Sequence, residues 1–126
     1  MSRARLLAAL GRSNVDEPTL EHLLRTTRTP DVDEEIARQR RILATALANA
    51  VNVLNPAVVV LGGFLGMLAS HDLEGFTGTV AAQTMPANGE DLQVLPAALG
   101  EDRLLFGAAE AAFAELLKDP AGVVPR

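Results

Sequence analysis

Side chains that could carry out chemistry are few in this chain of 126 residues. The two histidines, His22 and His71, lie far apart in the sequence, and neither has a spacing typical of metal ligands. The chain has no cysteine, which excludes a cysteine nucleophile and a disulfide scaffold and is typical of a cytoplasmic protein. We therefore expect two isolated surface histidines, no metal site and no complete set of catalytic residues.

The charged residues also have structural explanations. The net charge of −5 argues against broad contact with a nucleic-acid backbone, which needs a basic face. One basic cluster, Arg38–Arg41, could contact a partner or a nucleic acid, but a solvated helix face with an ion pair between Glu34 and Arg38 is favoured. The acidic residues near Asp31 and Asp33 suit a helix start, where negative charge stabilises the helix dipole.

The segment most suggestive of a binding site is residues 54–63, LNPAVVVLGG. Asn55-Pro56 must end any preceding helix, because proline cannot continue one. The apolar run Ala57–Leu61 predicts a strand buried on both faces, as in a parallel sheet covered by helices. Gly62 and Gly63 allow a sharp turn after it. That turn could form a ligand crevice, or it could serve only tight packing of the strand against the next helix.

The pattern of apolar and polar residues along the chain predicts a single α/β domain over residues 1–126, with few, mostly parallel strands packed by helices. No apolar run is long enough to span a membrane, and a secretory signal is not expected. The longest helix should bury one continuous apolar stripe, while its charged first half faces solvent. Thr19 is expected to cap the second helix, and Asp31 or Asp33 the third. The expected helices are Ser2–Leu10, Thr19–Thr26, Val32–Leu54, Leu73–Thr84 and Glu101–Lys118, the strands are Ala57–Leu61 and Leu92–Leu95, the turn is Met85–Asp91, and the apolar stripe is Ile36, Leu43, Leu47, Ala50 and Leu54.

Two blocks of this sequence resemble a known family. Residues 43–63, LATALANAVNVLNPAVVVLGG, and residues 96–102 followed by 107–110, PAALGED and GAAE, are similar to the C-terminal half of the ROK family of bacterial sugar-responsive repressors and sugar kinases. The similarity extends over about Arg3 to Asp119. It implies the C-terminal half of an actin-like, ribonuclease H-like ATPase domain.

The resemblance also implies that this chain is a C-terminal fragment. Family members begin with a lobe that carries the phosphate loop, the sugar contacts and the catalytic acids, followed by a zinc-binding His and Cys cluster. Repressors add a winged helix-turn-helix. None of these features appears in this sequence, so we expect no DNA or membrane binding by this chain itself. We expect its partners to be the missing lobe and a second subunit in a homo-oligomer.

Position by position, Gly62 and Gly63 match the adenosine-contacting glycines of the family, and Gly100 and Gly107 match glycines of its last segment. Kinases of the family commonly continue with a third glycine, where this chain has Phe64. The resemblance implies that a side chain at this position would crowd a nucleotide, so the glycines would be vestigial and no cofactor would bind.

Two functions follow as expectations. The first is a non-catalytic effector and dimerisation part of a sugar-responsive transcriptional regulator. The alternative is a fragment of a sugar kinase that contributes the adenosine side of an ATP cleft. A free-standing oligomerisation module is a third, weaker possibility. A chain that lacks its other lobe should expose a large apolar face.

Overall fold

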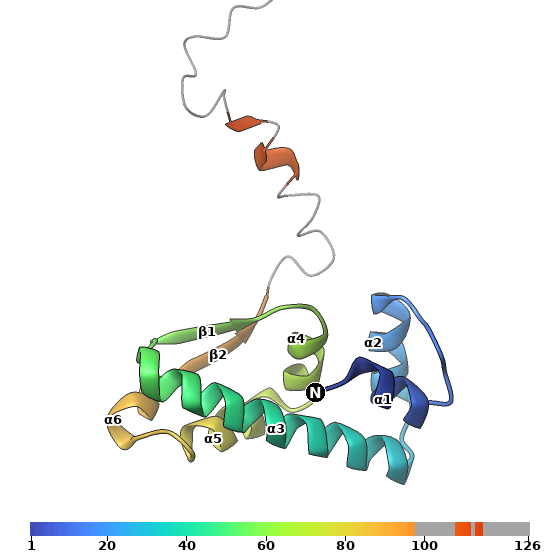
Figure 1. Ribbon diagram of the computed structural model, residues 1–126, viewed down its shortest axis with the longest axis horizontal. Coiled ribbons are helices and arrows are strands. Elements are labelled where there is room, and N and C mark those ends of the chain that lie inside the picture. Colours follow the sequence, from blue (N-terminus) through green and yellow to red (C-terminus); the bar gives the residue numbers. More distant parts are fainter. Residues whose placement is uncertain (98–107, 112, 115–126) are drawn as a thin grey trace, which may run out of the picture.

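A computed structural model describes residues 1–97, 108–111, 113 and 114 of the chain. A long helix runs along one side, with a pair of strands above its C-terminal end and two helices beside its N-terminal end (Figure 1). The elements between residues 1 and 97 are α1 (Arg3–Ala9), α2 (Glu17–Thr26), α3 (Pro30–Leu54), β1 (Val58–Leu61), α4 (Gly63–Ser70), α5 (Leu73–Ala81), α6 (Pro86–Gly89) and β2 (Gln93–Pro96).

The first two helices begin at side-chain caps. The Ser2 hydroxyl accepts a hydrogen bond from the backbone N–H of Arg5 at 3.4 Å, and α1 is followed by Gly11 at a φ of +67°. The cap of α2 is Asp16, whose carboxylate accepts the backbone N–H of Thr19 at 2.9 Å. The prediction that Thr19 is the cap was wrong. Proline suits the first turn of a helix, so Pro18 lets α2 start earlier, and Thr19 becomes the donor.

Helix α3 also starts earlier than predicted. Thr29 occupies the cap position without a side-chain hydrogen bond, and Pro30 is the first helical residue. The prediction that Asp31 or Asp33 is the cap was therefore wrong. Both residues lie in the first turn, where their charges complement the helix dipole. The helix ends as predicted before Pro56, and Asn55 adopts the left-handed conformation with a φ of 46°.

The described residues form two apolar clusters, and α3 and α4 contribute to both. The first cluster lies between the sheet, the second half of α3 and α5, and it contains Leu43, Ala44, Ala48, Val51, Leu61, Ala69, Phe76, Val80, Leu92 and Val94. The second joins α1 and α2 to the first half of α3, and it contains Leu6, Leu7, Leu20, Leu24, Val32, Ile36 and Leu68. Because α4 lies between the two clusters, its position is set by both.

The buried face of α3 differs from the predicted stripe. Its first half is packed rather than solvated, because α1 lies against it and covers Gln39 completely. Ile36 and Leu43 are buried as predicted, whereas Ala50 is exposed and Leu54 is 74% exposed. The predicted apolar stripe assumed that a single neighbouring element packs along the whole length of the helix. In the structure, α1 and α5 contact successive parts of it.

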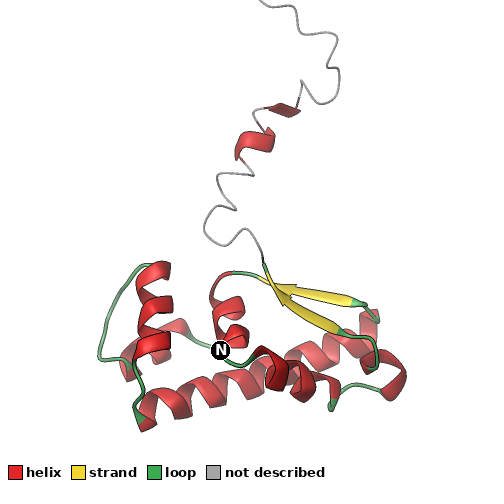
Figure 2. Ribbon diagram, turned by 180° about the vertical axis from the view of Figure 1, so that it is seen from behind, coloured by secondary structure: helices red, strands yellow, loops and turns green. Residues whose placement is uncertain are grey.

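Strands β1 and β2 are parallel, with Val59 paired to Val94 and Val60 to Leu95. Helices lie along one face of this sheet (Figure 2). On the other face, Val58, Val60 and Leu95 are 45%, 61% and 43% exposed. The predicted burial of β1 on both faces was therefore wrong. Among the described residues, nothing covers the second face.

The other predicted elements are confirmed with shifted ends. Strand β2 begins one residue later than predicted, α5 ends three residues earlier, and the predicted turn at residues 85–91 contains the short helix α6. Of the predicted helix Glu101–Lys118, residues 108–111, 113 and 114 are helical, and the others lie outside the described residues. Among the helices that the structure describes, none is long and apolar enough to cross a bilayer.

Glu35 accepts charged hydrogen bonds within α3 and forms an ion pair with Arg5 of α1, whose Nε lies 3.6 Å from its Oε1. Its carboxylate accepts two bonds from Arg38, at 2.9 and 3.0 Å, and one from the Gln39 amide at 2.7 Å. The predicted pair of Glu34 with Arg38 is thus replaced by a pair at a spacing of three residues. The bonds from Arg38, then those from Gln39 and the charge of Arg5, lower the pKa of Glu35 from 4.5 to about 2, against the opposing effect of burial.

Substituting Glu35→Gln is expected to reduce the acid sensitivity of the fold. Because the pKa of Glu35 is lower in the folded state, its stabilising effect is present above pH 4.5 and is lost as the pH falls toward 2. Urea unfolding between pH 7 and pH 2 should show a smaller loss of unfolding free energy in this variant than in the wild type. Glu34→Gln, at an exposed neighbouring position, should lose as much unfolding free energy between pH 7 and pH 2 as the wild type. Equal losses of unfolding free energy in all three proteins would contradict the prediction.

Candidate functional site

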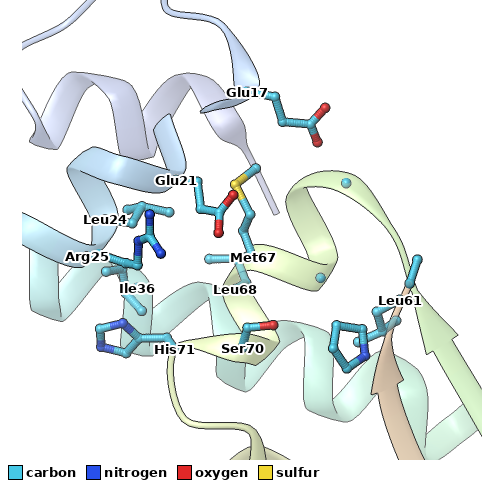
Figure 3. A pocket seen from close by; sticks show the side chains of 14 residues that line it. Glu17, Glu21, Leu24, Arg25, Ile36, Leu61, Met67, Leu68, Ser70 and His71 are labelled. Atoms are coloured by element: carbon cyan, nitrogen blue, oxygen red, sulfur yellow. The ribbon is translucent and has the colours of Figure 1, made fainter. Parts of the chain in front are cut away.

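A cavity of about 250 Å³ opens at the carboxyl ends of β1 and β2, between α2 and α4. Leu61, Pro96 and Ala97 contribute from the strand ends, and the first turns of α4 form another wall. Figure 3 shows Glu21 and Arg25 from α2 near Met67 of α4, and His71 and Ser70 just beyond. The full lining is Glu17, Glu21, Leu24, Arg25, Ile36, Leu61, Gly63, Gly66, Met67, Leu68, Ser70, His71, Pro96 and Ala97.

The turn from β1 into α4 brings the backbone close to this cavity. Gly63 adopts a φ of +54°, which favours glycine, and it lines the cavity. Gly62 is exposed, and a Cβ added to it would lie 3.8 Å from the Cβ of Ala97. A Cβ added to Gly66 would lie 2.6 Å from the carbonyl oxygen of Leu61. Gly66, which was not predicted as a site residue, is therefore packed too closely against the end of β1 to carry a Cβ, whereas Gly62 has room for one.

The side chain of Phe64 packs away from this cavity. It is partly buried against the cluster formed by α1, α2 and the first half of α3, and it is not among the residues that line the cavity. The expectation that it would crowd a ligand does not apply to this cavity. As the second residue of a helix, Phe64 lies on a different face from Gly63 and Gly66, and sequence alignment alone could not show this.

His71 is part of the cavity wall rather than an isolated surface residue. Its Nε2 lies 2.9 Å from Nη1 of Arg28, in the loop between α2 and α3. Arginine can only donate, so this contact requires a neutral imidazole whose Nε2 accepts. Partial burial, and then the positive charges of Arg28 and Arg40, lower the pKa of His71 from its ordinary value. The prediction of a surface histidine was wrong for His71, whereas His22 is exposed as predicted.

The polar wall of the cavity comes from α2. Glu17, Glu21 and Arg25 follow one another at steps of four residues, so they share one face of the helix. The sequence analysis did not select these residues. Their spacing was visible, but exposed charges at this spacing are common on helices that bind nothing. Only the position of α2 beside the glycine turn makes them candidates.

The structure brings together part of the predicted site. Gly63 lines the cavity, and Gly62, which is not part of the lining, lies beside Ala97 just after β2. Gly100 and Gly107 lie outside the described residues. Within residues 1–97, 108–111, 113 and 114, no three histidine or acidic side chains are arranged to hold a metal ion.

Parallel strands that end at a crevice beside a glycine turn define an open α/β domain with a small ligand-sized cavity. A model of the ROK family matches residues 7–115, which is most of the chain. The chain therefore belongs to the ROK family. No curated protein and no solved structure matches it.

Proposed function

We propose that this chain is the non-catalytic C-terminal part of a sugar-responsive transcriptional regulator of the ROK family. In this proposal it supplies one half of an actin-like domain and binds no nucleotide cofactor. The observation that carries the proposal is the cavity beside Gly63, whose described lining holds one arginine, Arg25, and the carboxylate of Glu21 one helical turn away. The ROK family includes both regulators and kinases, so the choice between them depends on this site.

The described lining of the cavity offers little cationic surface to the phosphates of a nucleotide. Arg25 is its one permanent cation, and Glu21 lies one helical turn from it on α2. His71 adds no charge in its neutral form. A triphosphate carries several negative charges and is normally bound by cationic side chains and backbone N–H groups. A site that serves packing or a neutral effector tolerates this balance of charges, whereas a triphosphate would need more cations than the lining supplies.

The uncovered sheet face supports a role as one part of a larger assembly. Val58, Val60 and Leu95 form an apolar strip on a parallel pair of strands, a type of sheet that is normally covered on both faces. Val53 and Leu54, which are 82% and 74% exposed, add apolar surface at the end of α3. In the proposed regulator, the rest of the parent protein or a second subunit covers this surface.

The isolated chain is accordingly expected to self-associate through the sheet face. Sedimentation velocity at micromolar concentration should show a dimer or larger species, and Val60→Lys should shift it to monomer because it places a charge in an apolar contact. Thr19→Lys, an exposed substitution on α2, should leave the association unchanged. A wild-type chain that sediments as a monomer would refute a homo-oligomer formed through this face.

The alternative is the kinase fragment, and the observation that favours it is the position of Gly63 in the cavity wall. An isolated adenosine-side lobe would recognise the nucleoside rather than the phosphates. The two functions therefore differ in whether adenosine itself binds, and this difference can be measured on the chain as it is.

Thermal unfolding with about 5 mM ATP, adenosine or tripolyphosphate distinguishes the two functions, because a ligand that binds the folded state raises the melting temperature. For the proposed regulator, adenosine should cause no shift, and ATP should cause no more than tripolyphosphate does. Tripolyphosphate controls for anion effects elsewhere on the surface. Stabilisation by both ATP and adenosine, removed by Glu21→Leu or Met67→Trp in the cavity wall, would contradict the proposal and support the kinase fragment.

A further inference from the structure

A second cavity, of about 200 Å³, lies between α3 and α5 and is separate from the one beside Gly63. It is a groove whose walls are largely solvent-exposed, with the buried ring of Phe76 in its lining. Two consecutive arginines of the basic cluster, Arg40 and Arg41, lie along the α3 side. The lining residues are Ala37, Arg40, Arg41, Asp72, Gly75, Phe76 and Thr79.

Arg40 is held in place and still has an unused donor. Its Nη2 donates to the backbone carbonyl of Asp72 at 2.6 Å and lies 3.4 Å from the Asp72 carboxylate. The guanidinium carbon lies 5.7 Å from the centroid of the Phe76 ring. Its Nε is buried and has no hydrogen-bond partner. A buried N–H without an acceptor is unfavourable, so a rearrangement of the Arg40 side chain that opens this group to an acceptor in the groove would be favoured.

Arg41 adds a second cation with no competing partner. Its side chain is exposed, and the part of the chain that the structure describes offers it no hydrogen bond or ion pair. Arg38 differs, because Glu35 occupies it with two hydrogen bonds. Of the three arginines in the basic cluster, Arg38 is therefore engaged by Glu35, whereas Arg40 and Arg41 line the groove.

We propose that the groove between α3 and α5 binds a small oxyanion, the carboxylate or phosphate group of a small molecule. Arg40 supplies a guanidinium that Asp72 and Phe76 hold beside the groove, and its Nε–H becomes accessible as the anion binds. Arg41 closes over the anion from the open side. Asp72 is the opposing charge in the wall. Its carboxylate is already engaged by the backbone N–H of Gly75 at 3.0 Å and by Arg40, so the groove keeps a net positive charge. The Thr79 hydroxyl donates to the Gly75 carbonyl and is not counted as a donor to the anion.

The test is a titration of the full chain with sodium phosphate and, separately, sodium acetate, against sodium chloride at equal ionic strength. Nitrogen–proton NMR spectra should show saturable shifts of the Arg40 Nε–H signal and of the backbone amides of Gly75 and Thr79. Arg41→Gln should weaken the binding about tenfold, the effect of losing one charge-assisted hydrogen bond. Arg12→Gln, which removes the same charge from an exposed loop, should leave the affinity unchanged.

The comparison of phosphate with acetate identifies which oxyanion the groove prefers, and saturable binding of either one supports the proposal. Because Arg41 is exposed and unpaired, its substitution should not disturb the fold, and unfolding curves check this. The proposal is overturned if chloride produces the same shifts as both oxyanions, or if Arg41→Gln binds as tightly as the wild type. Neither result depends on the nucleotide experiment at the other cavity.

Discussion

Replacing Gly66 with alanine is expected to lower the free energy of unfolding by about 1–3 kcal/mol, the range of costs for overpacking a tight site. The added Cβ would lie 2.6 Å from the carbonyl oxygen of Leu61, a distance that real Cβ atoms do not tolerate. The neighbour is backbone at the end of β1, so α4 must move as a whole to relieve the contact. Urea unfolding followed by circular dichroism measures the change.

Gly78→Ala is the matched control for this prediction. Gly78 also lies inside a helix, but a Cβ added to it would meet nothing within 4 Å. Here the higher helix propensity of alanine should stabilise the protein by about 0.5–1 kcal/mol. The two substitutions are chemically identical and should have opposite signs. If both variants were stabilised equally, the close approach of α4 to β1 would be refuted.

Gln39→Leu is expected to cost about 2–3 kcal/mol, although leucine has a similar volume and is more apolar. The Gln39 side chain is completely buried. Its Oε1 accepts the Ser2 backbone N–H at 3.0 Å, and its Nε2 donates to the Ser2 carbonyl at 2.8 Å and to Glu35. Leucine would leave these groups without partners and would loosen α1 from α3. Urea unfolding measures the loss, and hydrogen exchange should show faster exchange in α1.

Gln83→Leu serves as the control for burial. Gln83 also makes two side-chain hydrogen bonds, one from Thr45 at 2.9 Å and one to the Thr79 carbonyl at 3.2 Å, but its side chain is exposed. Water can replace its bonds, so the substitution should change stability by less than about 0.5–1 kcal/mol. Similar losses in the two leucine variants would mean that burial of Gln39 is not what makes its bonds matter.

Most elements could be predicted because their signals are local. Asn55-Pro56 stops α3, and the valine run forms β1. Two of the errors lie at helix starts, where a proline moved the first turn toward the N-terminus of the predicted position. Asp16 and Thr29 therefore took the cap positions expected for Thr19 and for Asp31 or Asp33. A start depends on competition among several nearby caps, and small differences in energy decide it.

The candidate site could be predicted only at its centre. Gly62 and Gly63 were visible because a glycine pair after a strand has a direct backbone consequence. Arg25 and His71 were not, because they reach the cavity only through the packing of α2 against α4. Phe64 is the opposite case, a residue that the sequence placed at the site and the structure does not. Its position beside the glycines suggested a ligand contact, but helix geometry directs its side chain into the core.

The sequence by itself determined the α/β character of the chain, its parallel strands, the glycine turn and its membership of the ROK family. These follow from local backbone preferences and from a pattern of residues that can be compared directly. Only the tertiary structure decided which charges gather around a cavity, which arginines are occupied, and that no described segment covers one face of the sheet. Those properties depend on distances between segments far apart in the sequence, and such distances exist only once the helices have packed.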